Sequence, residues 1–287
     1  MPATSRVLVD GRLTPADRAV VSVFDRGFQY GDALIETLRV ARGDAIAAEA
    51  HLQRLQRSAN LLGFPLPERD WRSDIGRLID VNELSAVEAW ARITLTRGTS
   101  ARGLLPPAAA AARCIVAVGP LDPSISRLRR DGLHAHILGF GRGAALAEHK
   151  HAFYLPSIEG RRQAALRGCD DGLFVGPGGA VEGATSANLF AVIDGVLVTP
   201  RGGGVLPGVT RARAWAAARA RGLRVVARRL PRSQLLGAGE AFLTNALFEV
   251  VPLVRIDDAP VGRGRPGALT RALQEDLLNG ATRRRIR

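Results

Sequence analysis

The sequence predicts a two-lobed α/β protein, with a small N-terminal α/β lobe and a larger, strand-rich C-terminal lobe. Strand and helix patterns alternate in the first half of the chain, and strand patterns dominate the second half. With 287 residues the chain exceeds a typical single domain. The segment Gly119-Pro120-Leu121-Asp122-Pro123 has the composition of a linker. We therefore predict lobes at residues 1–119 and 126–287, joined by a linker at residues 120–125.

The N-terminal lobe is predicted to begin with a hairpin, because apolar residues 7–9 and residues 12–13 flank an Asp10-Gly11 turn. In residues 49–62 apolar side chains recur at helical spacing, and Gly63 supplies a stop signal. The other elements expected in this lobe are a helix at 71–78 and strands at 33–40, 89–96 and 114–118. The alanine run at 108–112 is expected to form a short loop.

The C-terminal lobe is predicted to contain three helices, of which the one at 209–221 is rich in Ala and Arg and ends at Gly222. The other two helices are expected at 155–167 and 269–278. Short strands separated by tight turns are expected at 172–175, 189–193, 196–198, 223–227, 241–244 and 250–256.

Lysine is almost absent from the chain: of 40 basic residues 39 are arginine, and Lys150 is the only lysine. A guanidinium stays protonated near neutral pH, whereas a desolvated ammonium can lose its proton and act as a nucleophile or Schiff-base partner. We therefore expect Lys150 at a position where arginine fails chemically. His149 and His151 flank it and, when protonated, would help to depress its pKa. The alternatives are chance survival of a surface lysine and histidines that cap a turn or face solvent.

The formal net charge of +13 raises the possibility of nucleic-acid binding. The arginines are scattered through every segment, however, and aromatic residues make up only 5% of the chain and do not alternate with basic ones. Only residues 283–287 form a basic run, which is typical of a solvated tail. A basic, non-enzymatic nucleic-acid-binding protein is therefore the remote alternative, and we expect no nucleic-acid partner. The positive charge also suits anionic substrates.

Cys114 and Cys169 lack the CxxC or Cys/His spacing of a metal site, so we expect no metal and two reduced core cysteines. The N-terminus has no apolar segment of the signal-peptide type, and no apolar stretch approaches the roughly 18 residues that a membrane span needs. We therefore expect a soluble, cytoplasmic protein with no membrane partner.

Three further features suit an anionic aromatic cofactor, although each has a plainer interpretation. The carboxylate of Glu182 could keep a pyridine nitrogen protonated, but an acid before a small-residue turn is often a surface group. A glycine-rich run leads into the helix that begins near Val209, and helix N-termini bind phosphate, but many helices begin after Gly and Pro. Arg54 could clamp a phosphate with two hydrogen bonds, but helix arginines are more often solvated.

Together these segments resemble the fold-type IV pyridoxal-5′-phosphate (PLP) enzymes, the class IV aminotransferases, which include branched-chain and D-amino acid aminotransferases and 4-amino-4-deoxychorismate lyase. Asp25-Arg26-Gly27-Phe28-Gln29-Tyr30-Gly31-Asp32 followed by Glu36-Thr37-Leu38-Arg39-Val40 resembles the N-terminal signature of that family. Residues 51–55, 96–98, 150–155, 182–190, 206–211 and 240–252 follow in family order. The resemblance covers nearly the whole chain.

The resemblance implies a two-lobed subunit with PLP in the cleft, and Lys150 as the Schiff-base lysine that also shuttles the proton. Glu182 resembles the acid that pairs with the pyridine nitrogen. The remaining cofactor-binding residues that we predict are Arg54, Tyr154, Ser186, Val209, Thr210 and Asn245, where Thr185 is an alternative to Ser186. The predicted substrate-binding residues are Tyr30, Arg39, Arg97 and Arg102. The resemblance also implies a homodimer in which the partner subunit helps to close the site.

The chain departs from the family pattern at Ala33, at Ala246, and by one additional residue between Glu182 and Asn188. Asn245-Ala246-Leu247 and Arg97-Gly98 resemble the lyases, whereas Glu36 and Tyr154 resemble the aminotransferases. Both reactions begin with loss of a proton to Lys150. We predict an aminotransferase that moves an amino group between an amino acid, of the D- or branched-chain type, and a 2-oxo acid. The alternative is a lyase that releases pyruvate and 4-aminobenzoate from 4-amino-4-deoxychorismate.

Overall fold

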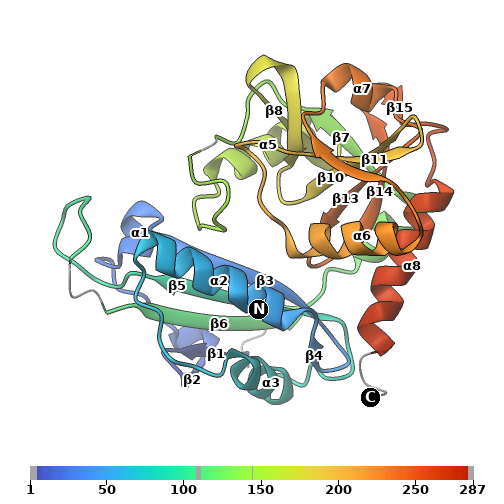
Figure 1. Cartoon of the computed structure of the whole chain (residues 1–287). Coiled ribbons are helices and arrows are strands. Elements are labelled where there is room, and N and C mark those ends of the chain that lie inside the picture. The colour runs from blue at the N-terminus through green and yellow to red at the C-terminus, as the bar shows by residue number, and fades with distance from the viewer. Residues whose placement is uncertain (1–4, 108–110, 144, 284–287) are drawn as a thin grey trace. The chain divides into compact units, whose positions relative to one another are not determined.

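The computed structural model describes residues 5–107, 111–143 and 145–283, so most of the alanine run at 108–112 lies outside the described residues. The chain divides into two compact units (Figure 1). Unit 1 comprises Met1–Leu121 and His149–Phe153, and unit 2 comprises Asp122–Glu148 and Tyr154–Arg287. The segment that carries Lys150 therefore belongs to unit 1, although its neighbours along the chain on both sides belong to unit 2.

Unit 1 is built on a six-stranded antiparallel sheet with the order β2-β1-β6-β5-β3-β4. Its strands are β1 (Arg6–Val9), β2 (Arg12–Pro15), β3 (Ala33–Ala41), β4 (Asp44–Ala45), β5 (Ala89–Thr96) and β6 (Arg113–Pro120). The predicted hairpin at Asp10-Gly11 is confirmed, with both turn residues at positive φ, as a tight hairpin requires.

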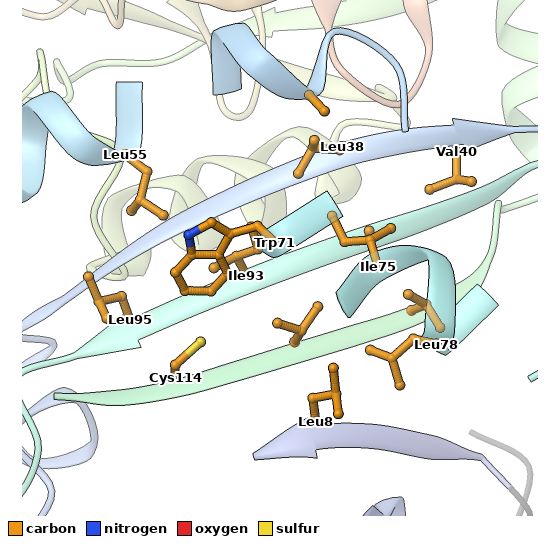
Figure 2. Packing of buried hydrophobic residues seen from close by; sticks show 14 of the residues in the cluster. Leu8, Leu38, Val40, Leu55, Trp71, Ile75, Leu78, Ile93, Leu95 and Cys114 are labelled. Atoms are coloured by element: carbon orange, nitrogen blue, oxygen red, sulfur yellow. The ribbon is translucent and has the colours of Figure 1, made fainter. Parts of the chain in front are cut away.

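Three α-helices and a short 3-10 helix accompany this sheet: η1 (Ala16–Arg18), α1 (Arg26–Tyr30), α2 (Ala48–Leu62) and α3 (Trp71–Val81). Helix α2 ends at Gly63 in the left-handed conformation, as its stop signal predicts. Leu55 of α2 and Trp71 and Ile75 of α3 pack with Leu38 and Ile93 of the strands (Figure 2). This core fixes β3 and α2, which carry the charged residues discussed below.

Unit 2 is built on a nine-stranded mixed sheet with the order β12-β11-β10-β13-β14-β7-β8-β9, and β15 pairs with β14. Its strands are β7 (Leu133–Ile137), β8 (Asp171–Gly176), β9 (Ala180–Ala184), β10 (Asn188–Ile193), β11 (Val196–Pro200), β12 (Val225–Arg228), β13 (Glu240–Asn245), β14 (Glu249–Ile256) and β15 (Ala259–Pro260). The pairs β11–β12, β14–β7 and β7–β8 are parallel, and the others are antiparallel.

The helices of unit 2 are α4 (Ser124–Asp131), α5 (Leu155–Leu166), η2 (Pro177–Gly179), α6 (Val209–Ala220), α7 (Arg232–Leu236) and α8 (Ala268–Arg283). Phe190 and Phe242 of the sheet stack with ring centroids 4.9 Å apart and pack in one core with Ala214 of α6 and Leu273 of α8. This core holds the start of α6 against the sheet.

The linker and one of the two cysteines differ from the sequence expectations. Residues 121–123 alone connect β6 to α4, because Ser124 already begins a helix that the linker composition did not predict. Cys114 is a buried free thiol in β6, and burial raises its pKa to about 12. Cys169 is only half-buried, so the expectation that it is a core residue is wrong. Among the described residues, no helix is long and apolar enough to cross a membrane.

Candidate active site

Lys150 lies in a short extended segment that is paired with β3. Its carbonyl oxygen accepts a hydrogen bond of 2.8 Å from the Ile35 amide, and the Ala152 amide donates one of 2.9 Å to the Ala33 carbonyl. The lysine side chain is half-buried. Backbone pairing on both sides of Lys150 fixes the point from which its side chain leaves the chain, which a nucleophile requires.

The two flanking histidines differ in their surroundings. His149 Nδ1 lies 3.0 Å from Ser58 Oγ of α2, so this ring ties the lysine segment to the helix that carries Arg54. His151 forms an isolated backbone bridge to Leu34 of β3. His149 therefore anchors the segment rather than simply facing solvent.

A buried ionic cluster joins β3 to α2. Arg54 donates from Nε to Glu36 Oε1 and from Nη2 to Glu36 Oε2, both at 2.7 Å, and His51 Nδ1 lies 2.7 Å from Glu36 Oε2. Burial alone would raise the pKa of Glu36, but the hydrogen bonds from His51 and Arg54, together with their charges, lower it to about 2. Arg54 is thus a buried, oriented guanidinium and not a solvated helix residue.

The three arginines predicted as substrate ligands lie in different environments. Arg39 is buried and pairs through Nε and Nη2 with Glu88. Arg97 is buried too, and it donates to Asp32 and to two backbone carbonyls at the end of α2 while lying over the Phe64 ring. Arg102 is exposed in the loop after β5. Of the three, Arg102 presents its guanidinium to solvent.

Tyr30, the fourth predicted substrate residue, lies at the end of α1 next to the same loop. Its hydroxyl oxygen accepts a hydrogen bond of 3.3 Å from the Gly103 amide, and Arg26 lies over its ring at 5.1 Å. The structure therefore brings Tyr30 and the loop of Arg102 together within unit 1.

In unit 2, Glu182 occupies a β-bulge. Phe174 of β8 pairs with Gly183 and Val175 with Val181, which leaves Glu182 as the unpaired residue of β9. A bulge of this kind re-aims a side chain. The sequence placed Glu182 before a turn, whereas it lies within a strand.

The Glu182 carboxylate lies against three glycines, Gly141, Gly176 and Gly204, and its Oε2 accepts a hydrogen bond of 3.1 Å from the Arg142 amide. A Cβ atom at Gly176 or Gly204 would overlap the carboxylate. The glycine-rich run before α6 thus admits this side chain closely, a role that the sequence did not predict for Gly204.

Thr185 and Ser186 are distinguished by their hydrogen bonds. Thr185 is buried, and its hydroxyl donates a 2.5 Å hydrogen bond to Asp171 Oδ1. Ser186 is exposed. The Thr185 hydroxyl is therefore engaged in the interior of unit 2, whereas Ser186 is accessible to solvent.

Helix α6 begins at Val209, after Gly208, with no side-chain cap. Asn188 donates from Nδ2 to the Leu206 carbonyl at 2.8 Å, and a Cβ atom at Gly208 would overlap Asn188 Oδ1. The Glu182–Asn188 segment and the start of α6 are therefore joined. No side chain caps the N-terminus of this twelve-residue helix, so its first amide groups can donate hydrogen bonds to an anion. The positive end of the helix dipole lies at the same place and favours a negative charge there.

Asn245 shapes a turn after β13. Its Oδ1 accepts hydrogen bonds from the amides of Leu247 and Phe248, at 3.0 and 2.9 Å, and Arg129 donates to the carbonyls of the same two residues. The Asn245 side-chain oxygen thus serves the turn itself. Beside it, Thr244 Oγ1 is buried and has no hydrogen-bond partner among the described residues.

Comparisons with known proteins identify the family of the chain. The family model described as "Amino-transferase class IV" matches residues 33–256. The chain belongs to the class IV aminotransferase family. D-alanine aminotransferase of Bacillus licheniformis is 27% identical over 96% of each chain. Aminodeoxychorismate lyase of Bacillus subtilis is 27% identical over 93% of this chain and 92% of the relative.

A solved structure of the same family adds the cofactor. The T.th. branched-chain amino acid aminotransferase with pyridoxamine 5′-phosphate superposes with a TM-score of 0.87 at 26% identity, covering 99% of this chain and 96% of the other. The predicted fold-type IV α/β class is therefore confirmed. Class IV aminotransferases are PLP-dependent, so the predicted cofactor is confirmed as well.

The residues of this class IV family member fit PLP chemically. A dianionic phosphate needs a guanidinium and oriented amides, and Arg54 and the uncapped start of α6 have that chemistry. A protonated pyridine nitrogen needs a carboxylate, and Glu182 supplies one. Among the described residues this carboxylate accepts a hydrogen bond from the Arg142 backbone amide alone. An aldehyde needs an amine, and Lys150 supplies the only lysine amine of the chain.

Sequence reasoning missed several residues that support this set. Glu36 gave a partial signal, because β3 is mostly apolar and Glu36 and Arg39 are its two ionisable residues. Arg26 lies in the N-terminal signature, but the sequence indicated no role for it, and Arg142 and Arg129 gave no signal, since all three are among 39 arginines. Their roles depend on partners that are distant in sequence and cannot be deduced from spacing.

Proposed function

We propose that this class IV enzyme is an aminotransferase that moves an amino group between an amino acid, of the D- or branched-chain type, and a 2-oxo acid. The cofactor is held as a Schiff base on Lys150. The observation that carries the proposal is the only lysine of the chain, fixed by backbone pairing to β3 at the position that the family motif predicts. Relatives named as aminotransferases match over nearly the full chain and support the same reaction.

Each predicted residue has a defined task in this reaction. When bound, PLP supplies an electron sink that stabilises negative charge on the substrate carbon. Lys150 Nζ accepts the proton from that carbon and returns it, and Glu182 keeps the pyridine nitrogen protonated. Arg54, Val209 and Thr210 bind the phosphate, and Tyr154 contacts the phenolic oxygen.

The remaining predicted residues complete the proposal. Ser186 contributes a hydroxyl to the cofactor, and its exposure supports it over Thr185. The Asn245 side chain is already used by the turn, so Asn245 would contact the phosphate through its backbone and not through its side chain. Arg102 binds the substrate carboxylate together with Tyr30. Arg39 and Arg97 are buried arginines that pair with Glu88 and Asp32, which supports structural roles for those two residues.

A lyase that acts on 4-amino-4-deoxychorismate is the second candidate. Two observations favour it: an aminodeoxychorismate lyase is among the relatives, and the segment Asn245-Ala246-Leu247 resembles the lyases. Both reactions share the first proton transfer, so Lys150 and Glu182 would serve either one.

We also propose a cytoplasmic homodimer. Two free thiols suit a reducing compartment. Large apolar side chains are exposed in the segment 20–28 of unit 1, and such a surface favours association with a second copy of the chain.

The deciding experiment incubates the PLP-loaded protein with a panel of D- and branched-chain L-amino acids and 2-oxoglutarate, and follows the new amino acid. A parallel reaction follows pyruvate release from aminodeoxychorismate. Transamination without pyruvate release is expected, and pyruvate release alone would establish the lyase instead.

Lys150→Arg tests the central residue. Arginine keeps the positive charge but cannot bind the cofactor aldehyde covalently, so turnover and the visible absorption of the lysine-bound cofactor should both disappear. Borohydride reduction of the wild-type protein followed by peptide mapping should label Lys150. Turnover and absorption retained in Lys150→Arg would overturn the proposal.

A further inference from the structure

The loop that follows β5 carries Arg102, and Arg26 binds this loop on both sides of Arg102. Arg26 donates from Nη1 to the Gly103 carbonyl at 2.8 Å and from Nη2 to the Leu104 carbonyl at 2.9 Å. On the other side of Arg102, Ser100 Oγ lies 3.3 Å from Arg26 Nη1. One guanidinium therefore holds three acceptors of a loop whose residues 101–105 are exposed.

Arg26 is itself held rigidly. It is 3% exposed, and its Nε donates to Asp32 Oδ2 at 2.8 Å. Its amide donates to the Gly98 carbonyl at 2.8 Å, and its guanidinium lies over the Tyr30 ring at 5.1 Å. The amide, the Nε atom and the guanidinium of Arg26 are therefore all held by contacts. A side chain held in this way can keep the loop that it binds in one conformation.

The loop needs this support because its own sequence favours no single conformation. Gly98 and Gly103 both have positive φ, at 82° and 148°, and the loop between them consists of small or exposed residues. A planar guanidinium donates two nearly parallel hydrogen bonds to successive carbonyls, which a lysine ammonium cannot reproduce. The fork of Arg26 therefore selects one conformation of residues 100–104.

We propose that Arg26 is a positioning residue that sets the place of the Arg102 guanidinium and thereby the preference of the enzyme for carboxylate-bearing amino donors. This inference rests on the proposed function of Arg102. Arg26 acts through the loop and through Tyr30, whose ring it contacts, and not on the substrate itself. Tyr30 adds a second contact to the same loop through its bond with the Gly103 amide.

Arg26→Lys tests the inference with two measurements. The first is the initial rate at which trypsin cuts the Arg102–Gly103 bond of the PLP-loaded protein, followed by mass spectrometry. Release of the loop should raise this rate at least about tenfold, because proteases cut mobile exposed segments. The second is kcat/KM for an amino acid donor relative to a simple amine donor. This ratio should fall about tenfold, mainly through KM, and Arg26→Lys should add no further loss to Arg102→Ala.

Arg69→Lys is the matched control. Arg69 is also a partly buried arginine of unit 1 that pairs with a carboxylate, Asp74, and lies near an aromatic ring, Trp71. It makes no described contact with the loop, so this variant should keep the wild-type cleavage rate and donor preference. If Arg69→Lys raises the rate of trypsin cleavage as much as Arg26→Lys does, the effect arises from general destabilisation and the proposal is overturned.

The outcomes separate this inference from the proposed function. Unchanged cleavage and unchanged donor preference in Arg26→Lys, in a wild-type enzyme that transaminates, overturn the positioning role. Equal losses on amine and amino acid donors overturn donor selection. If the wild-type protein does not transaminate while Arg26→Lys exposes the loop to trypsin, the proposed function fails and the mechanical role of Arg26 is supported.

Discussion

Glu36 lies fully buried between His51 and Arg54, so its ionisation contributes to stability. Its pKa falls from 4.5 to about 2, which corresponds to about 3 kcal/mol. Because the folded pKa is the lower one, this stabilisation is complete above about pH 4.5 and is lost as the pH falls toward 2. Glu36→Gln should therefore destabilise the protein by about 3 kcal/mol at pH 7. The difference in the free energy of unfolding between wild type and Glu36→Gln should decrease below pH 4.5. Urea unfolding curves measured from pH 7 to 3 check this.

Glu159→Gln is the control for this prediction. The pKa of Glu159 is also lowered to about 2, by hydrogen bonds from Arg162 and Gln163, but this carboxylate is solvent-exposed on α5. Solvent screens such a pair, so the variant should change stability little at any pH. A stability gap between wild type and Glu36→Gln that stays constant from pH 7 to 3 would contradict the buried ion cluster.

At the residue scale, the sequence was sufficient to predict the role of the one lysine but not the surroundings of the many arginines. Lys150 could be singled out because no other lysine exists. We could not deduce that Arg54 is buried, or which of Arg39, Arg97 and Arg102 is exposed, because each environment depends on the groups that the arginine meets in the fold. Glu36 and Glu88 are distant in sequence from the arginines that they bind.

At the element scale, the bulge in β9 makes Gly204 a sensitive position. A Cβ atom there would overlap the Glu182 carboxylate, which is the far end of a flexible side chain. Gly204→Ala should therefore leave the fold intact and displace the carboxylate. If Glu182 serves the pyridine nitrogen, turnover should fall by about two to three orders of magnitude, the loss expected when an electrostatic contact to the reacting group is removed. Steady-state turnover and the melting temperature check this pair of results.

Gly139→Ala is the matched control, because no atom lies within 4 Å of a Cβ atom at that position. It should retain both turnover and stability. The double variant Gly204→Ala with Glu182→Asp should recover part of the lost activity, since the shorter acid leaves room for the methyl group. Wild-type turnover in Gly204→Ala would show that the position of this carboxylate does not matter to the reaction.

The sequence predicted elements that have strong periodicity and missed those formed by tertiary contacts. β5 matches its prediction residue for residue, and α2 differs from its prediction by one residue. Helix α1 has five residues with an exposed Phe28, so it has no apolar periodicity to detect. β9 contains Glu, Gly and Ala, which disfavour strands, and it forms because β8 pairs with it.

At the scale of the whole molecule, the chain returns to unit 1 after it has begun unit 2. Residues 149–153 pair with β3, more than a hundred positions earlier in the sequence. No local pattern around Lys150 indicates this pairing, and a single boundary at 120–125 does not describe it. The family resemblance predicted the lysine, but only the fold reveals that unit 1 supports it.

The exposed apolar segment of unit 1 leads to the last prediction. Val20, Val23, Phe24 and Phe28 are 61–76% exposed, which is unfavourable for an isolated subunit in water. Burial of one phenylalanine contributes about 1.5–3 kcal/mol, and a two-fold interface contains each position twice. Phe28→Asp should therefore weaken self-association by at least about 3 kcal/mol, roughly a hundredfold in Kd, in analytical ultracentrifugation. Leu61→Asp changes a residue of similar exposure on α2 and should leave the dimer intact. If both variants self-associate as the wild type does, another surface joins the subunits, and a wild-type monomer would refute the homodimer.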